Sequence, residues 1–131
     1  MAVFALNICG APYSSQAPLS ALRFAKAALA AGHSIQRVFF YQEGVLLANA
    51  LSCPPQDETH LTQAWQQLAE EHQLELVVCV AAALKRGILD AREAKRHGLE
   101  HHNLADGFSL SGLGQLIDSL SQADRTVTFT S

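Results

Sequence analysis

The sequence is poor in charged residues, and it has neither a basic cluster nor a long apolar run. Asp, Glu, Lys and Arg make up 16% of its 131 residues, and the net charge is −3. Nucleic-acid-binding surfaces need clustered Lys and Arg, so we expect no direct contact with DNA or RNA. No stretch reaches the roughly 18 to 20 apolar residues that span a bilayer. The N-terminus also lacks the basic start and long apolar core of a signal peptide. The sequence therefore predicts a cytoplasmic protein without membrane contact.

Cysteine is scarce as well. The three cysteines, Cys9, Cys53 and Cys79, include no CxxC pair, and they are a poor disulfide framework for a cytoplasmic chain of this length. We therefore interpret them as thiols. With 49% hydrophobic residues, the chain is expected to fold as one domain over residues 1–131. The low share of charge indicates a partly apolar surface, as at a subunit interface.

Strand and helix patterns alternate along the chain. Continuous apolar or β-branched runs predict strands, and amphipathic spacing or capping signals predict helices. The expected strands are residues 3–9, 35–40, 74–79 and 125–129. The expected helices are residues 19–32, 45–51, 60–72, 80–87, 90–97 and 113–120, with Trp65 in the core. This order predicts an α/β fold, a single-domain, doubly wound, mainly parallel sheet with helices on both faces.

Cys79 is the most informative residue, because it ends the strand at 74–79 and a helix follows at once. In open α/β folds ligands bind at the rim formed by the carboxyl ends of the strands. The free N–H groups and the dipole of a helix N-terminus favour a thiolate, which is the nucleophilic form of cysteine. Cysteine is also among the most buried residue types. Its position alone leaves a nucleophile and a core residue as alternatives.

The other candidates carry weaker signals. Cys9 also ends a strand, but no helix start follows it, and Cys53 lies in a loop that can reach the same rim. Lys85 and Arg86 lie about 9 Å along the helix axis from Cys79. We therefore expect them to complement the C-terminus of the short helix rather than to activate the thiol.

Two further patterns are candidates for ligand sites. His97, His101 and His102 form a cluster whose spacing fits no zinc motif, so we interpret it as a solvated connector. The glycine- or hydroxyl-rich segments 10–18 and 107–114 precede helices, where anions bind, but neither matches a nucleotide motif. A nucleotide- or flavin-binding domain with its phosphate on segment 10–18 therefore stays an alternative.

Three long segments resemble the DsrE family, in the same order and at the same spacing. They are RFAKAALAAGHSIQRVFFYQEGVLLAN, AWQQLAEEHQLELVVCVAAALKRGILD and NLADGFSLSGLGQLIDSLSQADRTVTF. The most specific parts are VFFYQEGV, CVAAALKRG and GFSLSGLG, and the resemblance is greatest to the TusD branch of the family. It implies a sulfurtransferase in which Cys79 carries sulfur as a persulfide, with no metal or organic cofactor. Lys85 stands where the family often has arginine, a change we expect to be tolerated.

The resemblance also implies partners. They are TusB- and TusC-like sister subunits, in a hexamer with two copies of each of three subunit types, a TusA-like sulfur donor and a TusE-like acceptor. The implied pathway is 2-thiolation of the tRNA wobble uridine. A DsrE-type carrier in dissimilatory sulfur oxidation and a non-catalytic scaffold subunit are the alternatives. We expect docking surfaces in segments 41–58 and 97–110, and we expect the apolar neighbours Val78, Val80 and residues 81–83 to shelter the persulfide.

Overall fold

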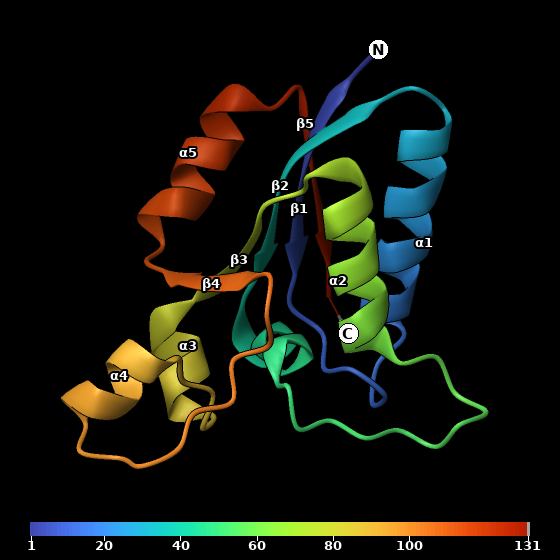
Figure 1. Ribbon diagram of the computed structural model, residues 1–131. Helices are drawn as coiled ribbons and strands as arrows, with labels where there is room; N and C mark the ends of the chain where they lie inside the picture. The colour runs from blue at the N-terminus through green and yellow to red at the C-terminus, as the bar shows by residue number, and fades with distance from the viewer. Residues whose placement is uncertain (131) are drawn as a thin grey trace.

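Five parallel strands form the centre of the computed structural model, which describes residues 1–130 (Figure 1). Their order across the sheet is β4-β3-β2-β1-β5. The strands are β1 (Val3–Ile8), β2 (Ser34–Phe40), β3 (Leu76–Cys79), β4 (Phe108–Ser111) and β5 (Arg125–Phe129). All neighbouring pairs are parallel, so the expected α/β class is confirmed.

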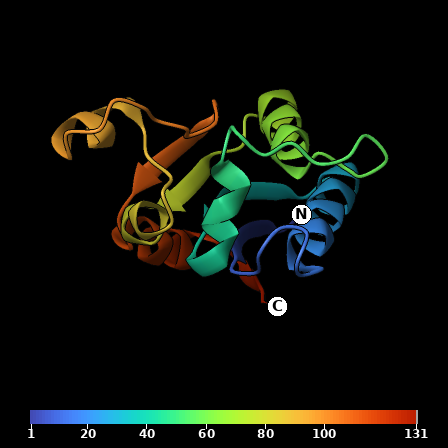
Figure 2. The ribbon, with the colours of Figure 1, turned by 90° about the horizontal axis from the view of Figure 1, so that it is seen from below.

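The helices cover both faces of this sheet, as expected. Figure 2, which looks onto the carboxyl ends of the strands, shows α1 (Ala17–Ala30) and α2 (Leu61–His72) on one side and α5 (Gly114–Gln122) on the other. The path from β1 to β2 to β3 steps in one direction, and right-handed crossovers place α1 and α2 on the same face. The connection from β4 to β5 returns across the sheet, so α5 lies on the opposite face.

Three short helices lie beyond the carboxyl ends of the strands (Figure 1). They are the 3-10 helix η1 (Gln42–Ala48), α3 (Val80–Lys85) and α4 (Ala91–Arg96). The Asp90 carboxylate accepts a hydrogen bond from the Glu93 N–H at 2.8 Å, which confirms the expected N-cap of α4. The helix expected at 45–51 begins earlier, at Gln42, and is a 3-10 helix. Gly44 lets it pack directly against the end of β1.

Large apolar side chains fill the space between the sheet and helices α1 and α2. Trp65 of α2 is completely buried, and its ring meets that of Phe40 edge-on at a centroid distance of 5.8 Å. Phe40 also contacts the ring of Phe108 at 5.4 Å. The expected core position of Trp65 is confirmed, and these contacts tie β2 and β4 to α2.

The strand β4 corrects the sequence interpretation, which treated residues 107–114 as a glycine-rich turn before a helix. Residues Leu76 to Cys79 of β3 pair in register with Phe108 to Ser111. Gly107 takes a positive φ of 89°, which turns the chain into this four-residue edge strand. A strand so short between glycines has too few residues to show a pattern.

Helix α5 is held to the sheet mainly by polar contacts. Arg37 of β2, with 11% of its side chain exposed, donates hydrogen bonds to the Ser119 hydroxyl at 2.9 Å and the Gln115 carbonyl at 3.2 Å. It also donates to the Glu75 carboxylate at 2.8 and 3.0 Å. Ser119 is the one residue of α5 that is fully buried. The inner face of this helix is therefore polar.

Three of the four large apolar residues of α5 and its start face outward instead. Leu113, Ile117 and Leu120 are 45%, 66% and 48% exposed, and their spacing of four and three residues places them on one side of the helix. Only Leu116 packs against the core. The sequence predicted an amphipathic helix here, but its polar side, not its apolar side, faces the sheet. We call Leu113, Ile117 and Leu120 the outer stripe.

Candidate functional site

Cys79 is the last residue of β3 and the N-cap of α3. Strand β3 lies between β2 and β4, so the strand end that carries Cys79 is flanked by strand ends on both sides. The residue is 2% exposed, and its thiol makes no capping hydrogen bond to the helix. The Cys79 sulfur is therefore buried at the rim of the sheet and is not engaged in capping the helix that follows it.

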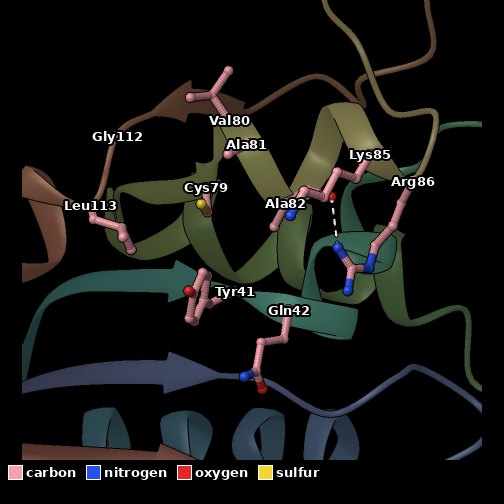
Figure 3. Close-up of a pocket in the computed structure, with 10 residues that line it drawn as sticks. All are labelled: Tyr41, Gln42, Cys79, Val80, Ala81, Ala82, Lys85, Arg86, Gly112 and Leu113. Atoms are coloured by element: carbon pink, nitrogen blue, oxygen red, sulfur yellow. Dashed lines mark hydrogen bonds between the residues drawn. The ribbon is translucent and has the colours of Figure 1, made fainter.

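A cavity of about 350 Å³ opens at this sulfur (Figure 3). Its walls come from the ends of three neighbouring strands and from α3. Tyr41 and Gln42 follow β2, Cys79 ends β3, and Gly112 and Leu113 follow β4. Since parallel strands end at one rim, residues that are far apart in sequence meet around the thiol.

Sequence reasoning did not assign Tyr41, Gln42, Gly112 or Leu113 to the site. Tyr41 and Gln42 lie within VFFYQEGV, and the two others lie within GFSLSGLG. These are two of the three segments most specific to the family resemblance. The sequence therefore contained a signal for these residues. They can be assigned to the site only once the structure shows that both segments follow strands adjacent to β3.

Backbone packing holds η1 against the end of β1. The Tyr41 N–H donates to the Ile8 carbonyl at 2.9 Å, and Gly44 lies so close to that carbonyl that a Cβ atom would be 2.0 Å from its oxygen. Only glycine fits this approach. The close packing fixes η1, and with it the wall of the cavity formed by Tyr41 and Gln42.

Arg86 ties η1 to α3. Its guanidinium donates to one carboxylate oxygen of Glu43 at 2.7 and 2.9 Å. It also donates to the Ala82 carbonyl at 3.0 Å, the bond drawn in Figure 3. The expected role of Arg86 at the C-terminal end of α3 is therefore confirmed, and the ion pair with Glu43 is added to it.

Lys85 reaches the cavity at the thiol, which its place along the helix axis did not indicate. It lines the same cavity as Cys79, and Figure 3 shows its side chain running back along α3 past Ala82. Helical side chains lean toward the N-terminus of their helix. The distance of about 9 Å along the helix axis separates the backbone positions of the two residues. It does not include the reach of the lysine side chain.

The other two thiols do not join Cys79 at its cavity. Cys9 follows β1, is half-buried, and burial raises the pKa of its thiol. Cys53 is exposed, and its Sγ donates to the Leu51 carbonyl at 3.4 Å. It lines a separate cavity beside Pro54 and Pro55. Cys53 therefore does not line the cavity at Cys79.

The predicted apolar shelter exists in part. Val78, Ala82 and Ala83 are buried, whereas Val80 is half-buried and Ala81 is exposed. The thiol is therefore shielded by the strand and by the inner side of α3, and it is reached through the cavity.

The phosphate site considered at segment 10–18 finds little support in the fold. Tyr13 donates from its hydroxyl to the Thr59 carbonyl at 3.0 Å, and Ser15 accepts from the Ala17 N–H at 3.0 Å. The acidic residue Glu58 lines the same hollow. Two of the hydroxyl groups in this segment are thus engaged with the backbone, and the neighbouring carboxylate would repel a phosphate.

The histidine cluster shows no metal-site geometry. His97, His101 and His102 are exposed, and within residues 1–130 no three side chains of His, Cys, Asp or Glu are grouped to hold a metal ion. In the same range, no helix is both long and apolar enough to cross a membrane.

Comparisons with known proteins agree with one another over nearly the whole chain. The model of the DsrE/DsrF-like family matches residues 2–129. The putative sulfurtransferase DsrE of Allochromatium vinosum is 52% identical over 126 residues, covering 96% of this chain and 97% of its own. A sulfurtransferase TusD homolog of Aliivibrio fischeri is 52% identical over 127 residues, covering 97% and 98%. Sulfurtransferase TusD of Cronobacter sakazakii is 51% identical over 126 residues, covering 96% and 98%.

A solved structure shows the same fold at lower identity. The ychN protein from E. coli superposes with a TM-score of 0.78 and is 21% identical, covering 98% of this chain and all of its own. The five-stranded architecture around Cys79 therefore occurs in a protein of experimentally known structure.

Proposed function

The chain belongs to the DsrE/DsrF-like family, among relatives named sulfurtransferases, and we propose that it accepts sulfur as a persulfide on Cys79 and passes it to an acceptor protein. One observation carries the proposal. The Cys79 thiol lies on a cavity built from the ends of three adjacent strands, while Cys9 and Cys53 lie elsewhere. A relay needs one such thiol, because the second comes from the partner.

The chemistry consists of two exchange steps. The Cys79 thiolate attacks the outer sulfur of a donor persulfide, the S–S bond of the donor breaks, and the donor leaves as a thiolate. The product is Cys79–S–SH. A cysteine thiolate of the acceptor then attacks the outer sulfur, and Cys79 leaves as a thiolate. Each step forms one S–S bond and breaks one, so neither an oxidant nor a reductant is consumed.

The burial of Cys79 suits this chemistry. A persulfide reacts with any thiol that reaches it, and a sulfur that is 2% exposed is open to a partner only through the cavity. A donor or acceptor cysteine therefore has to enter the cavity, which Tyr41, Leu113 and Lys85 help to line. This route restricts reaction of the persulfide to thiols that can enter the cavity.

We further propose that the chain works in an assembly with TusB- and TusC-like sister subunits, two copies of each of the three kinds. The outer stripe supports this proposal, because it exposes three large apolar side chains on one helix face. Apolar surfaces of this kind are typical of the interfaces of obligate complexes. Because Leu113 belongs to both the stripe and the cavity, a subunit on the stripe would lie beside the sulfur site.

The proposed donor is a TusA-like protein, the acceptor a TusE-like protein, and the pathway tRNA wobble-uridine 2-thiolation in the cytoplasm. Relatives named TusD support this assignment. The relative named DsrE is 52% identical to this chain, within one per cent of the two relatives named TusD. It supports the second candidate, a sulfur carrier in sulfur oxidation. Both candidates use the same persulfide on Cys79 and differ in the acceptor protein.

Intact-mass spectrometry without reductant tests the proposal. The purified protein is incubated with a persulfide-charged donor protein, alongside Cys79→Ser and the matched double variant Cys9→Ala, Cys53→Ser. We expect a gain of one sulfur in the wild type and the double variant, and none in Cys79→Ser. An equal gain in Cys79→Ser would overturn the proposal. No gain in any variant would favour a scaffold subunit.

A further inference from the structure

The cavity at Cys79 carries an unbalanced positive charge. Among the described residues, neither an aspartate nor a glutamate lines it, whereas Lys85 and Arg86 do. The charge of Arg86 is balanced by Glu43, with which it forms two hydrogen bonds of 2.7 and 2.9 Å. Lys85 forms no ion pair within residues 1–130. The free cation of the cavity is therefore Lys85.

The position of Lys85 lets its charge act at the sulfur. In Figure 3 its side chain turns back from the end of α3, passes Ala82 and brings its amino nitrogen toward Cys79. Arg86 points the other way, toward η1 and Glu43. The two basic residues thus have different tasks, since Arg86 joins two elements and Lys85 faces the space where sulfur would be carried.

We propose that Lys85 is the cationic partner of the sulfur anion on Cys79, both as the free thiolate and as the persulfide. The inference rests on the proposed function and adds a second residue to it. A transferred sulfur extends about 2 Å beyond Sγ into the cavity, and its negative charge resides on that outer atom. An ammonium in the same partly apolar cavity stabilises this anion more than it would in bulk water.

Alkylation of the protein by iodoacetamide tests this role directly, with peptide mass spectrometry resolving each thiol. Lys85→Met removes the charge and keeps most of the length, so we expect the rate constant at Cys79 at pH 7 to fall by about three- to tenfold. Its pH profile should also move to higher pH. Lys85→Arg should keep both near the wild-type values. Cys53, exposed and away from the cavity, is the reference thiol in every sample.

Lys26→Met is the matched control, since Lys26 is an exposed lysine on α1. An unchanged rate at Cys79 in Lys85→Met would overturn the inference. So would a loss in Lys85→Arg as large as in Lys85→Met, because that pattern means packing rather than charge. Sulfur loading from a persulfide donor is measured on the same samples. If the wild type takes up no sulfur, the proposed relay fails, while the alkylation rates still decide whether Lys85 stabilises the anion.

Discussion

The replacement of Gly44 by alanine is the sharpest structural perturbation that the fold suggests. The added Cβ would lie 2.0 Å from the carbonyl oxygen of Ile8 and 2.8 Å from its carbon. Both contacts are with backbone of a central strand, so no side chain can rotate away. Helix η1 would have to move outward, and the 2.9 Å hydrogen bond from the Tyr41 N–H to the same carbonyl would be strained or lost.

The expected cost is large for the addition of one methyl group. Overpacking in a core typically costs about 1–3 kcal/mol, and a lost backbone hydrogen bond adds about 1 kcal/mol. Together they lower the free energy of unfolding by about 3 kcal/mol, or the Tm by roughly 10 °C for a chain of this size. Because η1 carries one wall of the cavity, sulfur loading of Cys79 should also slow.

Urea unfolding followed by circular dichroism measures the change in midpoint and slope. Gly114→Ala is the matched control. Gly114 begins α5, and its added Cβ has no neighbour within 4 Å, so alanine should be neutral or stabilise by up to about 1 kcal/mol. A Gly44→Ala protein within 0.5 kcal/mol of the wild type (about the scatter expected for a surface substitution) would refute the packing argument.

Three other changes test separate parts of the structure. Arg37→Met should loosen α5 from the sheet, because it removes the hydrogen bond to Ser119. We expect the free energy of unfolding to fall by about 1–3 kcal/mol and amide hydrogen exchange in α5 to become faster. Ile117→Asp should leave Tm within a few degrees but abolish co-purification with sister subunits, and an intact complex would contradict the interface. Burial raises the pKa of Cys9, so below about pH 9 Cys9 should be alkylated more slowly than the exposed Cys53, and equal rates would contradict its burial.

Local patterns in the sequence were enough to predict four of the five strands and the place of Cys79 at the end of one of them. The runs that became β1, β2 and β3 are continuous because parallel strands are covered on both faces, and a cysteine between such a run and a helix start can lie only at the rim. The same reasoning placed Trp65 on the inner side of α2. These features depend on neighbours in sequence.

The features that sequence reasoning missed depend on tertiary partners. Strand β4 has four residues between glycines and is recognisable only through its pairing with β3. The reversed orientation of α5 follows from Arg37, which is 78 residues from Gln115 in sequence. The position of Lys85 required the direction of a side chain rather than the spacing of Cα atoms. The first two features depend on contacts between segments that are far apart in sequence and are brought together by the topology of the sheet.

Transfer of isotopically heavy sulfur in a single turnover is the most direct test of the central claim. The protein is charged by a persulfide donor carrying the label, separated from it, and mixed with an acceptor protein that has a reactive cysteine. The account predicts the label first on the peptide containing Cys79 and then on the acceptor, with neither signal in Cys79→Ser. A Cys79→Ser protein that takes up and passes on the label like the wild type would contradict it.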